Sequence, residues 1–281
     1  MTPTWMLVKL MTTNSLPNKN TREHNKPAVD DATSQPDILI VEDIGVSFEE
    51  KKGDLRVLRH VSFNIHEHEF VCLLGPSGSG KSTLLRVLSG LLQPTHGSVR
   101  YPQSNTPKIG YVFQDANLLP WRTVIKNITL PLEIDGVPFE KAQEQAMDLI
   151  HLTNLQGFEH AWPQDLSGGM AQRVAIARAL IQKPDILLMD EPFGSLDALT
   201  REKMSAELLN IWQSQRSTVL MVTHSISESI LLSDRVLVIS PRPGRITMDV
   251  KINLSRPRND EMRFTPQFGE YAHQLRASIQ A

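Results

Sequence analysis

The sequence predicts an α/β fold, in which a buried and mainly parallel sheet alternates with helices. Short apolar runs at residues 70–74, 186–189, 219–223 and 236–239 have the length and composition of strands that are buried on both faces. Helical stretches separate these runs, and leucines recur at helical spacing between residues 81 and 92. This order is typical of parallel sheets, because parallel neighbours need a crossover connection.

Two regions add to this core. Val61, Phe63 and Ile65 alternate with polar residues, which predicts a half-exposed antiparallel strand and an antiparallel β subdomain. Strand signals fade over residues 115–166, where small and aliphatic residues at helical spacing predict an inserted α-helical subdomain. Those residues are Ala142, Ala146, Leu149 and Ile150.

Composition excludes several classes of protein. With 281 residues, 40% of them hydrophobic, the chain is too apolar for general disorder. A net charge of −2 provides no basic field for nucleic acid, and no run approaches the roughly 20 apolar residues of a membrane-spanning helix. The lone Cys72 excludes an intrachain disulfide and suits a reducing cytoplasm, and the N-terminal residues do not resemble a secretory signal.

The two ends of the chain are predicted to lie outside the main fold. Residues 1–36 are rich in Thr, Asn, Pro and charge, which predicts a disordered extension. Residues 255–281 are predicted to form a charged tail with a short helix. The domain itself is expected to span residues 37–254.

A phosphate-binding loop follows the first buried run. Residues 75–82 match the pattern G-x-x-x-x-G-K-[ST] after a strand and before a helix, where backbone N–H groups and the helix N-terminus can bind phosphate. Lys81 is expected to reach the β- and γ-phosphates of a nucleoside triphosphate, and Ser82 to bind Mg²⁺. The predicted ATP-binding residues of the loop are Gly75, Pro76, Ser77, Gly78, Ser79, Gly80, Lys81, Ser82 and Thr83.

Polar residues end three other strand-like runs. Asp190 is placed to contact Mg²⁺, and Glu191 to orient or deprotonate the attacking water. His224 ends the run 219–223 and can hold the γ-phosphate, although a structural histidine is the alternative. Gln114 can contact Mg²⁺ or water, with a surface glutamine as the alternative. Phe48 can stack on adenine or pack in the core.

A further motif carries a family resemblance. Residues 166–170 read Leu-Ser-Gly-Gly-Met and precede a helix-like run, and residues 195–197 read Ser-Leu-Asp. Together with the phosphate loop, Gln114, Glu191 and His224, these residues resemble the ATP-binding subunits of ABC transporters over approximately residues 38–250. The resemblance implies a P-loop NTPase (RecA-like) core and ATP hydrolysis. Met170, Ala171 and Ser225 depart from the commonest family pattern, and none of these departures removes a catalytic group.

The resemblance also implies partners. Two subunits, two copies of this chain or alternatively a mixed pair, would pack head to tail, so that Ser167, Gly168 and Gly169 close on the ATP of the partner subunit and Asp197 lies near the junction. A separate transmembrane permease would hold the pair at the cytoplasmic face of the membrane. A solute-binding protein would act indirectly.

Three segments point to import. Residues 114–122, 196–201 and 240–246 resemble ATPases of sulfonate, taurine, nitrate and thiamine-precursor importers. An exporter subunit is the alternative. A DNA-repair ATPase would carry long coiled coils before the signature, and a translation factor would carry two cassettes. We also expect Leu118, Leu119 and Trp121 to line a groove for a permease helix, with core packing as the alternative.

Overall fold

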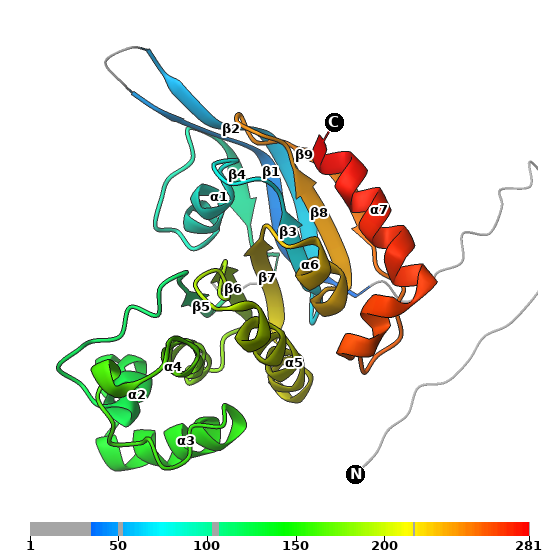
Figure 1. Cartoon of the computed structure of the whole chain (residues 1–281). Coiled ribbons are helices and arrows are strands. Elements are labelled where there is room, and N and C mark those ends of the chain that lie inside the picture. The colour runs from blue at the N-terminus through cyan, green and yellow to red at the C-terminus, as the bar shows by residue number, and fades with distance from the viewer. Residues whose placement is uncertain (1–34, 50–52, 103–106, 216, 281) are drawn as a thin grey trace, which may run out of the picture. The chain divides into compact units, whose positions relative to one another are not determined.

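A six-stranded sheet forms the centre of the computed structural model, which describes residues 35–49, 53–102, 107–215 and 217–280 (Figure 1). The strand order is β5-β6-β7-β3-β8-β9, with β9 antiparallel to β8 and the other neighbours parallel. Every residue of β3, β6 and β7 is buried, so the apolar runs form the predicted central strands. The strands are β3 (Phe70–Leu74), β5 (Ile109–Val112), β6 (Ile186–Asp190), β7 (Thr218–Thr223), β8 (Arg235–Ile239) and β9 (Ile246–Lys251).

A second, antiparallel sheet has the order β2-β1-β4. It contains β1 (Asp37–Phe48), β2 (Leu55–His66) and β4 (His96–Arg100). Val61, Phe63 and Ile65 are buried in β2, as their alternation predicts. β4 is mostly exposed and begins with His-Gly, which is why its sequence carries little strand signal.

The strand β3 separates two hydrophobic cores. Val71 and Leu73 face the core shared with the antiparallel sheet and with the helix α1. Phe70, Cys72 and Leu74 face the core built by the other helices. Successive side chains of a strand point to opposite faces, so one five-residue strand joins both cores and fixes the position of the loop that follows it.

The helix α1 (Lys81–Leu88) is shorter than the leucine spacing predicts. The prediction extended it to residue 92, yet Leu91 is 66% exposed. The chain turns because Gly90 takes a left-handed conformation with φ of 76°, and the amide of Leu92 donates to the carbonyl of Arg86. The amide of Gly90 itself donates to the carbonyl of Val87 at 3.1 Å, which is the bond that the glycine after the C-cap makes in a Schellman motif.

Helices gather in the region predicted as an inserted helical subdomain. Residues 115–166 contain α2 (Val124–Ile134), α3 (Phe139–Leu152) and the short 3₁₀ helix η1 (Pro163–Asp165). Both α2 and α3 pack against α4 (Gly168–Leu180), as Figure 1 shows in green and olive. The helical layer therefore continues past residue 166 into α4.

The last third of the chain returns to the sheet. It contains α5 (Ala198–Gln215), α6 (Ile226–Leu232), the 3₁₀ helix η2 (Asp260–Phe264) and α7 (Pro266–Gln280). The predicted charged tail differs from this structure, because Phe268 and Leu275 of α7 are buried in the core. Arg258 is also buried, where it donates to backbone carbonyls that include those of Ile230 and Leu254.

The predicted disordered extension falls on residues 1–36, of which 1–34 lie outside the described residues. Among the helices of the described part, none combines the length and the apolar character needed to cross a bilayer.

Candidate functional site

The predicted phosphate loop connects β3 to α1 in close contact with its neighbours. A Cβ on Gly80 would lie 2.7 Å from Cδ2 of Leu58, and Gly80 has a φ of 97°, which favours glycine. The amide of Leu84 donates to the carbonyl of Gly80 at 2.9 Å, so α1 begins directly after this residue. The loop therefore ends on a helix N-terminus, an arrangement that binds phosphate through backbone N–H groups.

Lys81 holds a buried positive charge inside the loop. Its side chain is 4% exposed, and its Nζ donates to the carbonyl oxygens of Gly75 and Pro76 at 3.0 Å each. Oε1 of Glu191 lies 3.2 Å from the same nitrogen. A buried ammonium needs such partners because it has lost its water. Glu191 therefore supplies a negative charge beside this buried ammonium.

Ser82 and Asp190 form the second polar contact of the site. The hydroxyl of Ser82 donates to Oδ1 of Asp190 at 2.8 Å, and the hydroxyl of Tyr111 lies 3.4 Å from Oδ2. Burial raises the pKa of Asp190, the hydrogen bond from Ser82 opposes this shift, and the charge of Glu191 adds to it. The contact joins the start of α1 to the end of β6.

The oxygens of Ser82 and Asp190 fit a magnesium site. Mg²⁺ prefers oxygen ligands and takes only one or two from the protein when phosphates and waters supply the others. Among the described residues, no group of three or more His, Cys, Asp or Glu side chains is placed to hold a metal ion. The hydroxyl and the carboxylate lie within hydrogen-bond distance, so one cation could contact both.

Replacing Asp190 with Asn is expected to raise the unfolding temperature of the nucleotide-free chain at pH 7. The native pKa of Asp190 is raised, so its ionised form costs folding free energy above that pKa, whereas an amide does not ionise. The difference from wild type should shrink as the pH falls through the native pKa, and it should vanish below the ordinary aspartate pKa of about 3.9. Thermal unfolding at several pH values measures it.

The exposed Asp148 provides the control for this experiment. Asp148→Asn should leave the unfolding temperature nearly unchanged at every pH. An Asp190→Asn chain that unfolds at or below the wild-type temperature at pH 7 would contradict the prediction.

Glu191 lies where the chain leaves β6, with a positive φ of 43° that is rare outside glycine. Its amide donates to the carbonyl of Val222 at 3.1 Å, which fixes it beside the end of β7. Nδ1 of His224 lies 2.9 Å from Oε2 of Glu191. The side chain of His224 is 48% exposed and that of Glu191 is 16% exposed, so the carboxylate borders solvent on the histidine side.

A pocket of about 490 Å³ opens between the phosphate loop and the antiparallel sheet. Phe48, which is 41% exposed, lines it from the end of β1, and Gln114 lines it from the loop after β5. A Cβ on Gly194 would lie 3.5 Å from Nε2 of Gln114, so this amide is held next to the chain that follows Glu191. An exposed aromatic ring in the pocket wall can stack on a planar base.

The structure brings most of the predicted nucleotide residues to this pocket. It is lined by Phe48, Ser77, Gly78, Gly80, Lys81, Ser82, Thr83, Gln114 and Glu191. Asp190 and His224 reach it through their contacts with Ser82 and Glu191. Gly75 and Pro76 supply carbonyls to Lys81, and the hydroxyl of Ser79 is buried without a hydrogen-bond partner among the described residues.

The signature residues lie elsewhere on the chain. Ser167 caps α4, since its hydroxyl accepts from the amide of Met170 at 3.3 Å. Gly169 packs closely against α5, where an added Cβ would lie 3.0 Å from Cγ2 of Thr200. Neither Ser167, Gly168 nor Gly169 lines the pocket that holds Lys81. Asp197 caps α5 by accepting from the amide of Thr200. Hydrogen bonding to the side chain of Thr200, and next to its amide, lowers the pKa of Asp197.

Two polar residues on α4, which no sequence pattern singled out, join the signature helix to the segment around Gln114. Nε2 of Gln172, which is 3% exposed, donates to the carbonyl of Phe113 at 3.2 Å. The guanidinium of Arg178 donates to the carbonyls of Ala116 and Asn117. Their signal was weak, because a polar residue in a helix is usually solvated and only their place in an otherwise apolar run is unusual.

Arg201 and Glu228 form a second pair of polar residues that no sequence pattern singled out, and they lie behind the turn that contains Asp197. Arg201 donates to the carbonyls of Phe193 and Leu196 and lies 3.8 Å from Glu228. Glu228 is buried, and its Oε2 accepts from the hydroxyl of Thr223, the residue before His224. Burial raises the pKa of Glu228, with the Thr223 hydrogen bond opposing this shift. The pair connects the turn after β6 to the end of β7.

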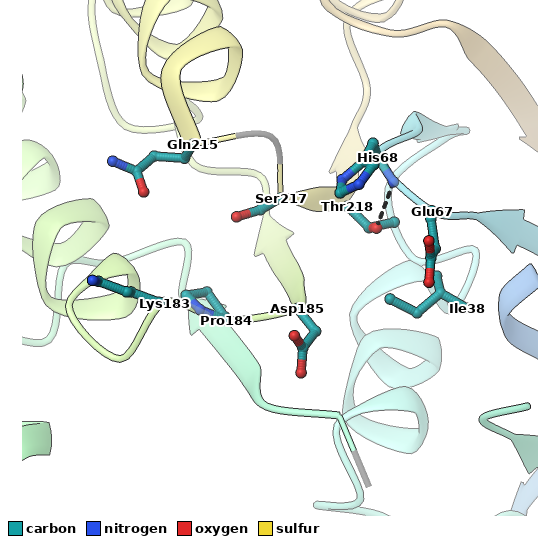
Figure 2. Close-up of a pocket in the computed structure, with 9 residues that line it drawn as sticks. All are labelled: Ile38, Glu67, His68, Lys183, Pro184, Asp185, Gln215, Ser217 and Thr218. Carbon is teal, nitrogen blue, oxygen red and sulfur yellow. Dashed lines mark hydrogen bonds between the residues drawn. The ribbon is translucent and has the colours of Figure 1, made fainter. Parts of the chain in front are cut away.

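Another pocket, shown in Figure 2, lies at the opposite end of the sheet. Its lining includes Asp185 and Thr218, which stand at the amino ends of β6 and β7, together with His68 and Lys183. The amide of His68 donates to the hydroxyl of Thr218 at 3.0 Å. Ligands of open parallel sheets bind beyond the carboxyl ends of the strands, so the pocket beside Lys81 is the better candidate.

The fold defines a class of protein, a P-loop NTPase. Residues 58–194 match the family model of the ABC transporter. The chain is 42% identical over 252 residues to a taurine import ATP-binding protein of Rhizobium johnstonii, covering 86% of this chain and 96% of the relative. An aliphatic sulfonates import ATP-binding protein of Bacillus thuringiensis is 40% identical over 223 residues (78% and 88%), and a nitrate import ATP-binding protein of Synechocystis is 39% identical over 247 residues (84% and 93%).

A solved structure agrees with these relatives. A dimeric ATP-binding cassette in a post-hydrolysis state, bound to ADP and Pi, superposes with a TM-score of 0.68 at 32% identity, covering 77% of this chain and all of that one. The chain belongs to the ABC transporter family, as an ATP-binding subunit that hydrolyses ATP. The predicted family, fold and enzyme class are confirmed.

Proposed function

We propose that this chain binds MgATP in the pocket beside Lys81 and hydrolyses it between two head-to-tail copies, to energise import of a small anionic solute through a separate permease. The observation that carries this proposal is the convergence of three contacts on one edge of the sheet. They are Lys81 with Glu191, Ser82 with Asp190, and Glu191 with His224.

The residues of the pocket have different roles in ATP binding and hydrolysis. Lys81 and the loop amides bind the phosphates, and Phe48 receives the adenine. Glu191 accepts the proton of the attacking water, while His224 holds the carboxylate in place. Ser82, Asp190 and Gln114 would hold Mg²⁺, whose charge offsets that of the phosphates when it is bound. Arrival of a phosphate beside Lys81 releases Glu191 from its ion pair and frees it for the water.

Two observations favour a composite site. The N-terminus of α4 and the Ser167 hydroxyl form a second anion-binding arrangement, which lies outside the pocket of its own chain. The similar cassette bound to ADP and Pi is described as dimeric. A head-to-tail pair would bring the Ser167 of each copy to the nucleotide of the other.

Mixing two inactive variants tests this arrangement. Lys81→Ala damages the phosphate loop, and Gly168→Asp places a carboxylate in the signature; each alone is expected to lose most ATP hydrolysis. In a mixed head-to-tail dimer both defects fall in one site and the other site is intact. An equal mixture should therefore recover about a quarter of wild-type hydrolysis if the sites are independent.

The same experiment has an outcome that would contradict the composite site. If the signature acted within its own chain, neither subunit of the mixture would hold an intact site and no activity would return. Thermal unfolding of each variant shows whether it is folded. If both variants are folded and mixing restores no hydrolysis, the composite site is contradicted.

The importer assignment rests on relatives named for taurine, aliphatic sulfonates and nitrate. These solutes share a small size and an anionic group. We assign the chain to the cytoplasmic face of a membrane, docked on its permease. Uptake of labelled taurine, an alkanesulfonate and nitrate, compared between cells with the wild-type chain and cells with Glu191→Gln, tests the assignment. Unchanged uptake of all three would contradict it, and reduced efflux instead would favour an exporter.

We place the contact with the permease in a groove beside Gln114. The residues that line this groove differ from those that the sequence predicted. None of the predicted anchors Leu118, Leu119 and Trp121 lines the groove there. Leu118 packs on the core, and Trp121 is 69% exposed. The groove is lined by Phe113, Asn117, Leu130, Pro131, Ile134 and Arg178, among others. Ile134 is 77% exposed, an unusual position for isoleucine, and suits contact with an apolar helix.

A further inference from the structure

The loop that joins β8 to β9 lies directly against the phosphate loop. A Cβ on Gly244 would collide with the carbonyl oxygen of Ser79, so only glycine allows this approach. The amide of Gly244 donates to the carbonyl of Val57 at 2.9 Å, and its carbonyl accepts from the amide of Arg59 at 3.0 Å. The loop is thereby tied to β2 on one side and to the phosphate loop on the other.

Hydrogen bonds within the loop hold its shape. The amide of Ser240 donates to the carbonyl of Arg245 at 2.9 Å, and the amide of Arg245 donates to the hydroxyl of Ser240 at 3.1 Å. Between these two residues the chain reads Pro-Arg-Pro-Gly, and proline and glycine restrict the shapes that this turn can take. Arg242 therefore projects from a turn whose base is fixed.

The side chain of Arg242 reaches the tip of the phosphate loop. Its Nε donates to the carbonyl of Gly78 at 3.3 Å, and its Nη2 lies 3.8 Å from the position of a Cβ on Gly78. Arg242 lines the same pocket as Phe48 and Lys81. A guanidinium has five N–H donors, of which this contact uses one.

The pocket beside Lys81 is lined by more positively than negatively charged side chains. Its lining contains three cationic side chains, Lys81, Arg86 and Arg242, and one carboxylate, Glu191. Glu191 already offsets the charge of Lys81 at 3.2 Å. A nucleotide triphosphate brings several negative charges, and arginine is well suited to phosphate because its planar fork can donate two parallel hydrogen bonds.

We propose that Arg242 is a further nucleotide-binding residue, whose guanidinium contacts a phosphate oxygen of the ATP held by the phosphate loop. The inference rests on the proposed ATP site and adds to it a residue from outside the motifs that predicted that site. Arg242 supports the tip of the loop through Gly78 and binds the nucleotide through its remaining donors.

Affinities of the full chain for MgATP, ADP and AMP, measured by calorimetry at low and moderate salt, test the proposal. Arg242→Ala is expected to weaken ATP binding about tenfold, because a charge-assisted hydrogen bond is lost, and to lower the salt dependence of binding. AMP, which lacks the outer phosphates, should be affected least. Arg242→Lys should retain most of the ATP affinity.

Two further variants separate charge from loop support. Arg242→Gln can still donate to the carbonyl of Gly78 but carries no charge, so it should bind ATP as weakly as Arg242→Ala. Arg245→Ala removes the same charge from an exposed side chain of the same loop and should bind ATP within about twofold of wild type. Thermal unfolding without nucleotide checks that each variant is folded.

The outcomes are distinct. If wild type binds no ATP, the proposed function fails and this inference fails with it. If wild type binds ATP and Arg242→Ala binds it equally well, the inference alone is overturned. Rescue by Arg242→Gln, or equal losses for AMP and ATP, would overturn it as well, because the residue would then only support the loop.

Discussion

A chain with Glu191 replaced by Gln is expected to bind ATP and to hydrolyse it about 10²- to 10⁴-fold more slowly than wild type. The amide keeps the shape of the side chain and can still contact Lys81 and His224, which lie 3.2 and 2.9 Å from the carboxylate oxygens. It cannot accept a proton from water. Phosphate release at saturating ATP measures the rate, and size-exclusion chromatography in MgATP should show the variant as a stable dimer.

Glu202→Gln is the matched control, since Glu202 is an exposed carboxylate on α5. It should hydrolyse ATP at the wild-type rate. If Glu191→Gln also hydrolyses ATP at the wild-type rate, Glu191 is not the base and the assignment of the site is wrong.

Replacing Lys81 with Ala is expected to produce the largest loss of ATP affinity. Truncating one partner of a buried, hydrogen-bonded charge pair costs about 2–5 kcal/mol, which corresponds to a factor of about 30 to several thousand in affinity. Lys81 is 4% exposed, so little water can replace it. Titration with a fluorescent ATP analogue measures the change.

The exposed Lys203 on α5 provides the control for Lys81. Lys203→Ala removes an equal charge and should leave ATP affinity unchanged. Circular dichroism must show that Lys81→Ala is folded, because the substitution leaves Glu191 without its cation. Wild-type affinity in a folded Lys81→Ala chain would place ATP elsewhere.

The sheet and the phosphate loop could be predicted because their signals are local. The apolar run at 70–74 has its characteristic neighbours on either side, so strand, loop and helix could be predicted together. The end of α1 could not be predicted in this way, because Leu91 continues the leucine spacing while Gly90 stops the helix. Helical spacing alone does not record where a glycine turns the chain.

Contacts between segments that are far apart in the sequence could not be predicted from sequence patterns. Gln172 and Phe113 are 59 residues apart, and Arg242 and Gly78 are 164 residues apart. Neither pair has a spacing that periodicity can detect, since both depend on how the strands are ordered in the sheet. Similarly, α7 looks like a charged tail until its buried Phe268 and Leu275 are seen on the core.

If two copies form the proposed head-to-tail pair, the position of the helix α4 has a mechanical consequence. Ser167 stands at its first turn, and Gln172 and Arg178 clamp its side to the segment around Gln114. A pull on Ser167 by the partner's nucleotide would shift the helix as a rod and carry the Gln114 segment with it. In that proposed pair, each subunit would respond to the nucleotide bound at the signature of its neighbour, and the proposed permease groove beside Ile134 would move with the nucleotide state of the opposite copy.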